Sequence, residues 1–191
     1  PPNNFVDPVA SKYSKYFAQT GNKIRLIYLS STSVYGDHKG VWVNENSKLK
    51  AKSELGKWRL NVETKWLSFA KLNHLPLLIL RLSGIYGLGR SAFDRINNKS
   101  FKIVKSPNIL FSRIHIDDIT SIIIKFINNE NLKGVYNLSD NMPATSEAIY
   151  LEAFRLLKLE PPTSKNLDEL NLSKTAMGFF SESKKVSNKK L

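Results

Sequence analysis

The chain contains no cysteine, only three histidines and no long apolar segment. Without cysteine it forms neither disulfides nor thiolate metal sites, although this absence says little about compartment. The histidines His38, His74 and His115 are scattered, with no pair at ligand spacing, so no metal site is expected. The longest apolar runs, 75–80 and 122–127, fall far short of the roughly 20 residues that a membrane span requires. With no signal pattern at the N-terminus, we expect a cytoplasmic protein without a membrane partner.

Acidic residues are scarce relative to basic ones: 16 aspartates and glutamates stand against 29 lysines and arginines, a net charge of +13. An excess of positive charge of this size suggests nucleic acid as a partner. Apart from a basic tail, however, the lysines are spread along the chain, and they accompany many asparagines and isoleucines. An AT-rich genome produces this bias without selection for binding. A solvated basic surface is therefore the favoured explanation, and nucleic-acid binding ranks third among the functions considered.

The length and apolar content set the scale of the fold. With 191 residues, 41% of them hydrophobic, the chain can bury one core. It opens at Pro1 without an initiator methionine and stops at Leu191 inside a basic stretch. We therefore expect a single domain over residues 1–191 that is incomplete at both ends.

Two apolar strands each run directly into polar residues. Apart from Arg25, residues 24–29 are apolar enough to be buried on both faces, as in a parallel sheet covered by helices. They lead into the hydroxyl cluster 30–33, and the strand expected at 77–82 leads into the polar and glycine-rich segment 83–90. Ligands of such sheets bind at the carboxyl ends of the strands, so these two segments are candidate site loops.

Helical periodicity alternates with these strands. Capping residues and apolar spacing predict a first helix that Asp7 caps and that Gly21 ends, and a later helix that Asp117 or Asp118 caps. Further helices are expected at about 53–73, 91–98, 117–128 and 145–157, and further extended pieces at 41–43, 101–104, 109–116 and 134–138. This alternation of helices and strands along the sequence predicts an α/β fold whose later portion is less regular.

Four stretches, in this order, carry a resemblance to a known family: Leu29–Gly36, Arg59-Leu-x-x-Glu63, Arg81–Arg90 and Ser112–Ile119. The sequence resembles the extended short-chain dehydrogenase/reductase superfamily, of the NAD-dependent epimerase/dehydratase type. The resemblance implies a Rossmann-like doubly wound parallel sheet, with residues 1–90 as sheet core and residues 91–191 as a mixed, smaller portion with substrate-side segments. It also implies NAD or NADP as cofactor and an unknown small-molecule substrate.

The family's glycine-rich turn after the first strand is absent from this sequence. The segment Gly36–Gly40 does not replace it, because it follows a later strand and opens no helix. By analogy with the family, the first strands of the Rossmann half, with this turn, would precede Pro1.

Family members use a Ser or Thr, a Tyr and a Lys, and the resemblance places these positions on Ser31, Leu55 and Arg59. Leu55 cannot transfer a proton, and Arg59 keeps the positive charge but cannot act as a base. The sequence is thus an atypical member without the Tyr-x-x-x-Lys motif. The resemblance implies cofactor contacts from residues at two strand ends and from the helix: Ser30, Ser31, Arg59, Leu82, Ser83 and Gly84.

On the substrate side the candidates are Tyr35, Tyr86 and Arg90. Packing is the favoured role for both tyrosines, since neither has a lysine one helical turn away. The guanidinium of Arg90 suits a phosphate or carboxylate, and a surface salt bridge is equally favoured. Many nucleotide-sugar enzymes of the family carry Asn where Gly84 stands, which argues against a sugar nucleotide.

Two functions lead. The first is an atypical NAD(P)-dependent epimerase/dehydratase or oxidoreductase-like protein, with Ser31 and Arg59 as its catalytic positions. The second is a non-catalytic NAD(P)-binding sensor or scaffold, which Leu55 favours. Substrate, choice between NAD and NADP, and oligomeric state are left open.

Overall fold

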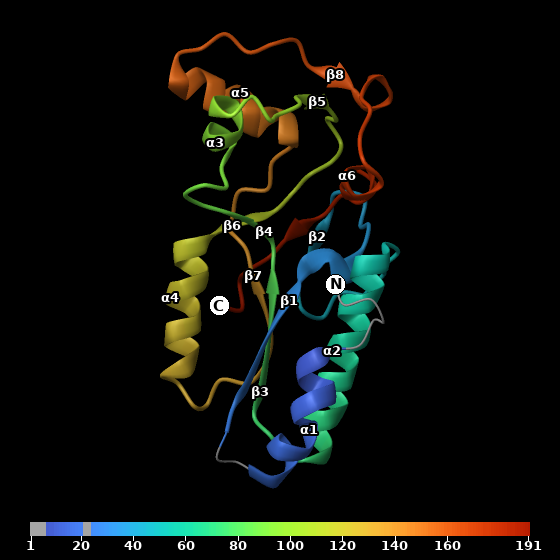
Figure 1. The fold of residues 1–191 in the computed structure, drawn as a ribbon, viewed down its shortest axis with the longest axis vertical. Helices are drawn as coiled ribbons and strands as arrows, with labels where there is room; N and C mark the ends of the chain where they lie inside the picture. Colours follow the sequence, from blue (N-terminus) through green and yellow to red (C-terminus); the bar gives the residue numbers. More distant parts are fainter. Residues whose placement is uncertain (1–6, 21–23) are drawn as a thin grey trace.

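A computed structural model describes residues 7–20 and 24–191. Its centre is a parallel sheet of three strands in the order β1 (Leu26–Ser31), β3 (Leu77–Leu82) and β7 (Gly134–Leu138). Helices α1 (Pro8–Thr20) and α2 (Glu54–Leu72) cover one face of this sheet, and α4 (Ile116–Ile127) covers the other (Figure 1). This layered arrangement confirms the predicted α/β, Rossmann-like fold.

Strand alternation divides the core between the two faces of β3. Leu77 and Ile79 pack against Trp58 and Trp66 of α2, whereas the intervening Leu78 and Leu80 join the core on the α4 side. On that side a second set completes the core: Ile119 and Phe126 of α4, with Tyr136 and Leu138 of β7. β3 is therefore apolar on both faces, as its sequence predicts.

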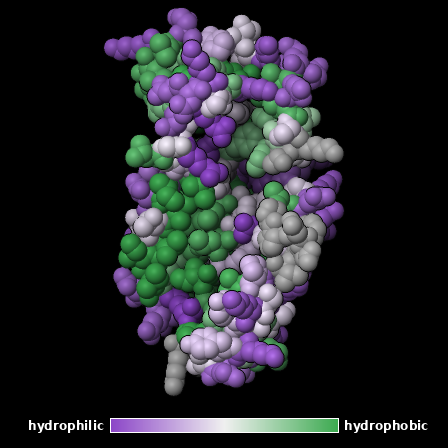
Figure 2. Space-filling model, in the orientation of Figure 1, coloured by the Kyte–Doolittle hydropathy of each residue, from purple (hydrophilic) through white to green (hydrophobic). Residues whose placement is uncertain are grey.

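β1 departs from the expectation of burial on both faces. It lies at the edge of the described sheet, with β3 as its one neighbour, and Leu29 is 42% exposed. Figure 2 shows a continuous apolar surface over α4 and the adjoining part of the sheet; its exposed large side chains include Ile116, Ile124 and Ile127. An edge strand with a neighbour on one side only cannot bury both faces fully.

The remaining elements extend the molecule beyond the carboxyl ends of the sheet strands (Figure 1). They are the strand pairs β2 (Trp42–Val43) with β9 (Lys185–Val186), β4 (Gly84–Tyr86) with β6 (Arg113–His115), and β5 (Val104–Lys105) with β8 (Lys165–Asn166), and the helices α3 (Ala92–Asn97), α5 (Ser146–Leu157) and α6 (Lys174–Phe179). Short helical turns η2 (Thr32–Tyr35) and η3 (Leu167–Glu169) complete the set. The strand β4 corrects the prediction that residues 83–90 form only a loop.

Helix caps follow the sequence in most cases and fail in one. Ser53 caps α2, Thr145 caps α5, and the Asp7 carboxylate accepts from the Ala10 amide at the start of α1. The predicted end of α1 at Gly21 lies outside the described residues. For α4 the cap is His115, whose Nδ1 accepts from the backbone N–H of Asp117, so Asp117 and Asp118 lie in the first turn and are not caps. There their charges still favour the helix dipole.

A buried ion pair joins α2 to β3. Glu63 and Arg81 are 1% and 4% exposed, and Arg81 Nη2 donates to Glu63 Oε2 at 2.7 Å. Arg81 Nε also donates to the same carboxylate, at 3.1 Å from Oε1. Burial alone would lower the pKa of Arg81, but the hydrogen bonds and charge of Glu63 outweigh it and raise that pKa above its usual value. The Arg81 guanidinium is therefore held in its charged form against Glu63 inside the protein.

Within the part of the chain that the structure describes, no helix is long and apolar enough to cross a membrane. Nor do three or more His, Asp or Glu side chains of those residues gather as they would around a metal ion.

We expect Glu63→Gln to lower the free energy of unfolding by about 3 kcal/mol, because the substitution leaves the Arg81 cation buried without its counter-charge. Urea unfolding followed by circular dichroism measures this loss. Glu152→Gln is the matched control, since its pair with Arg155 is exposed on α5 and should stabilise little. Equal effects of the two substitutions would contradict the prediction.

Candidate functional site

The candidate site lies where the three parallel strands end together. Ser31 is the last residue of β1, Ser83 follows β3 and Ser139 follows β7. Because the strands are parallel and paired in register, with Ser31 beside Leu82, these hydroxyl residues reach the same edge of the sheet. The structure thus brings together the two segments that the sequence marks as site loops.

Ser30 and Ser31 have different surroundings although they are neighbours. The buried Ser30 hydroxyl donates to Glu63 Oε1 at 2.5 Å, so it belongs to the buried pair beneath the site. Ser31 is only half-buried and caps η2, its oxygen accepting from the Ser33 amide at 3.2 Å. That bond uses the oxygen and leaves the hydroxyl hydrogen available to another acceptor. Of the two serines, Ser31 is the one that can donate to a ligand.

Arg59 reaches the end of β1 from helix α2. Its Nη1 donates to the Leu29 carbonyl at 3.2 Å and to the Tyr28 hydroxyl at 3.3 Å, and its guanidinium lies over the Trp58 ring. Leu29 stands two residues before Ser31, so the cation and the free hydroxyl are brought to one strand end. The contact with Tyr28 was not predicted from the sequence, although alternation along β1 would have pointed Tyr28 toward α2.

Leu55 lies on the same side of α2 as Arg59, one helical turn earlier, and is 44% exposed. The position at which the family resemblance expects a tyrosine therefore carries an apolar side chain at the surface. No proton can move through it. Helix α2 begins at Glu54, close to the predicted start at about residue 53, so Leu55 lies in its first turn as expected.

The tyrosines near the strand ends are held in their protonated form. Tyr35 is fully buried; its hydroxyl donates to Asn137 Oδ1 at 2.7 Å and accepts from Arg81 Nη1 at 3.0 Å. Burial raises its pKa above the usual value of 10.0 against the opposing charge of Arg81, and burial likewise raises the pKa of Tyr28. Tyr35 thus lies in the interior, with its hydroxyl engaged by Asn137 and Arg81.

Tyr86 lies in β4 and remains 37% exposed. Its ring meets the His115 ring edge to face, with centroids 5.1 Å apart. Burial, and then the carboxylates of Asp140 and Asp118, raise the pKa of the Tyr86 hydroxyl. A tyrosine that serves as a base at neutral pH needs a lowered pKa, and the pKa of Tyr86 is shifted in the opposite direction.

Ser83 and Gly84 follow β3 with contrasting properties. The Ser83 hydroxyl is buried and has no hydrogen-bond partner among the described residues, which sequence reasoning alone could not reveal. Gly84 pairs with Arg113, and a Cβ placed on it would meet its nearest atom, the Ser112 carbonyl oxygen, at 3.4 Å. The backbone therefore does not require glycine at position 84. The half-buried Leu82 and the exposed Arg90 lie before and after this turn.

Comparison with known proteins gives the fold a family context. No family model matches the chain. It is 29% identical over 142 residues to Protein YeeZ of Escherichia coli K12, covering 74% of this chain and 49% of that protein. A functionally unknown conserved protein from Silicibacter pomeroyi DSS superposes with a TM-score of 0.90 at 34% identity, over 98% of this chain and 66% of the other.

A UDP-glucuronic acid 4-epimerase from Bacillus cereus, solved in complex with NAD, superposes over 100% of this chain and 62% of its own, with a TM-score of 0.71 and 17% identity. The chain has the fold of the extended short-chain dehydrogenase/reductase superfamily. The fold that the four sequence stretches imply is thereby confirmed. The chain spans about half the length of the curated relatives that it matches, 49% of Protein YeeZ.

We expect the stability of this short-chain dehydrogenase/reductase fold to fall in alkaline solution partly through Tyr35. A hydroxyl whose pKa is raised by folding stabilises the protein fully below its unfolded pKa of about 10, and this contribution is lost as pH rises through the folded pKa. Unfolding free energies measured across the alkaline range should fall less steeply with pH in Tyr35→Phe. The exposed Tyr13→Phe is the control, and parallel slopes for Tyr35→Phe and the unsubstituted protein would contradict the prediction.

Proposed function

We propose that this chain forms the larger part of an NAD(P)-binding domain, in which residues 1–90 supply sheet core and residues 91–191 a mixed portion with substrate-side segments. The glycine-rich turn for the pyrophosphate would come from sequence that precedes Pro1. The open edge of β1 supports this proposal, because Leu29 and the half-buried Ile27 present an apolar face that further sheet and helix would cover. The likeness to an epimerase solved in complex with NAD also supports an NAD(P)-binding domain.

One observation carries the proposed cofactor site: Arg59 is bound to the β1 backbone two residues from the available Ser31 hydroxyl. Ser83 adds a buried hydroxyl without a partner in the described chain. These groups fit the polar end of a dinucleotide, which needs hydrogen-bond donors and a cation near its phosphates or amide. We propose that Arg59 and Ser83 hold it, with Ser31 and the backbone of Leu82 and Gly84 beside them.

NAD or NADP, when bound, would supply the hydride acceptor or donor. The protein's own groups then have separate tasks. Ser31 donates a hydrogen bond to an oxygen of the substrate, and Arg59 holds a fixed positive charge that stabilises negative charge but cannot accept a proton. This supports an atypical epimerase/dehydratase or oxidoreductase-like activity on a small molecule. The proposed substrate side includes Tyr86 and Arg90.

A second candidate is a non-catalytic NAD(P)-binding sensor or scaffold. The observation that favours it is the combination of an exposed Leu55 with raised pKa values at Tyr28, Tyr35 and Tyr86. Such a protein would bind the dinucleotide without moving a proton. The two candidates share the cofactor site and differ in turnover.

Calorimetric titration with the oxidised and reduced forms of NAD and NADP tests the shared site. We expect the full-length protein to bind either the two forms of NAD or the two forms of NADP, and residues 1–191 alone to bind poorly. Arg59→Ala should weaken binding about tenfold through the loss of a charge-assisted contact. Lys65→Ala, an exposed cation on the same helix, is the control. Absence of binding to the full-length protein would exclude both candidates, and micromolar binding by residues 1–191 would refute the proposed missing turn.

Turnover separates the two candidates. If the protein is an enzyme, chromatography with mass spectrometry will detect conversion of some member of a panel of nucleotide sugars and small carbonyl compounds, a readout that also detects redox-neutral reactions in which the nicotinamide is regenerated. We then expect Ser31→Ala to lower that rate about a hundredfold, the usual weight of a positioned hydrogen-bond donor, while cofactor affinity changes little. An unchanged rate in Ser31→Ala would show that the catalytic position is wrong, and no turnover with cofactor binding intact would favour the sensor.

A further inference from the structure

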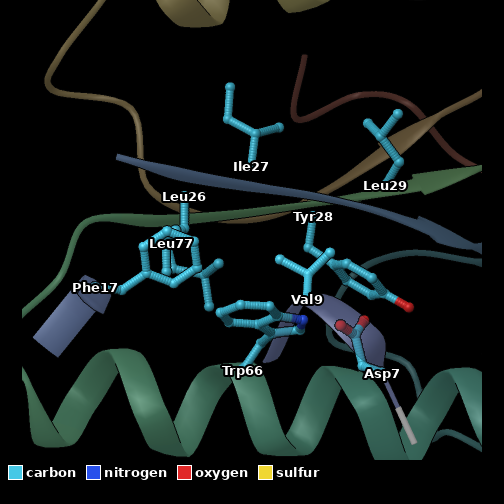
Figure 3. A pocket seen from close by; sticks show the side chains of 9 residues that line it. All are labelled: Asp7, Val9, Phe17, Leu26, Ile27, Tyr28, Leu29, Trp66 and Leu77. Carbon is cyan, nitrogen blue, oxygen red and sulfur yellow. The ribbon is translucent and has the colours of Figure 1, made fainter. Parts of the chain in front are cut away.

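A cavity of about 310 Å³ lies between α1, β1 and α2, on the sheet face opposite α4 (Figure 3). One end of it is apolar and is formed by Phe17, Leu26 and Leu77. In Figure 3 these side chains lie together, and Asp7, the Tyr28 hydroxyl and the indole nitrogen of Trp66 lie toward the other end. The cavity is therefore amphipathic along its length.

Trp66 contributes a hydrogen-bond donor that the protein does not use. The residue is 5% exposed, and its Nε1–H is buried without a partner among the described residues. A buried donor that lacks an acceptor costs free energy, so the fold gains when a molecule in the cavity offers it an oxygen. The indole edge that bears the nitrogen faces the polar end of the cavity (Figure 3).

Asp7 contributes an acceptor at the same end. One carboxylate oxygen accepts from the Ala10 amide at 2.8 Å and so caps α1, and the side chain is 9% exposed. The other oxygen makes no hydrogen bond to a described residue. Beside it, the Tyr28 hydroxyl accepts from Arg59, which leaves its own hydrogen to donate. The polar end thus offers an N–H donor and a carboxylate acceptor.

We propose that this cavity binds a small, mainly apolar, neutral molecule with a single hydroxyl group, of the size of a two-ring phenol or alcohol. One hydroxyl satisfies both walls, because its oxygen accepts from Trp66 Nε1–H while its hydrogen is donated to Asp7. A carboxylate or phosphate would be repelled by Asp7, and an ammonium group could not accept from Trp66. The volume lies at the small end of ligand pockets, which suits one or two rings.

The test is calorimetric titration of the 191-residue protein with 2-naphthol, naphthalene and 2-naphthoate. We expect saturable binding of 2-naphthol, about fivefold to tenfold weaker binding of naphthalene because the hydrogen bonds are lost, and no binding of 2-naphthoate. Tightest binding of 2-naphthoate, or no saturable binding of 2-naphthol, would overturn the proposal.

Three variants locate the site. Trp66→Phe should lower 2-naphthol affinity toward that of naphthalene and change naphthalene binding less, because it removes the N–H donor, together with one ring of the indole, and leaves the acceptor Asp7 in place. Trp58→Phe is the matched control, since Trp58 carries a second buried indole N–H without a described partner and does not line the cavity. Val9→Trp, at a half-exposed position on α1 that lines the cavity, should fill it and abolish binding of both neutral compounds. Binding that survives Val9→Trp, or equal effects of the two Trp→Phe changes, would place the ligand elsewhere.

Discussion

The buried pair of Glu63 and Arg81 is the interaction on which the strand-end region depends. Glu63 comes from α2 and Arg81 from β3, and around them Ser30, Tyr35 and Asn137 are engaged through hydroxyl and amide hydrogen bonds. One network therefore ties helix α2 to all three strands at their carboxyl ends. Two buried charges depend on these partners for their stability. The network therefore restricts the ends of the strands to few arrangements.

This network also decides which polar groups remain for a ligand. It already engages the side chains of Ser30, Tyr35 and Asn137 in hydrogen bonds, although their residue types alone would suit a binding site. Ser31, one residue further, faces away from it and keeps its hydroxyl hydrogen, and Arg59 lies one helical turn before Glu63 on α2, close enough to reach β1. The buried network and the candidate site thus use neighbouring residues of β1 and successive turns of α2.

Much of this could be predicted from sequence, for reasons that are local. The apolar blocks of β3 and β7, the caps Ser53 and Thr145 and the span of α2 follow from periodicity and capping chemistry. Pairings between distant residues could not be predicted: Glu63 meets Arg81 across 18 positions and Tyr35 meets Asn137 across 102. Two-residue strands such as β8 and β9 have no periodicity to detect, and the Trp66 cavity depends on how α1, β1 and α2 pack together.

The chemistry of the site turns on how its tyrosines are held. In a site that uses tyrosinate, a nearby cation must stabilise the charged form more than burial penalises it. Here Arg59 contacts Tyr28 and Arg81 contacts Tyr35, yet burial raises both pKa values above normal. Arg81 is shared between two partners, since its Nε and Nη2 donate to the Glu63 carboxylate and its Nη1 donates to the Tyr35 hydroxyl. The same pair that organises the strand ends therefore lies beside a phenol that burial keeps neutral, and the polar groups left at the end of β1 are the Ser31 hydroxyl and the Arg59 guanidinium.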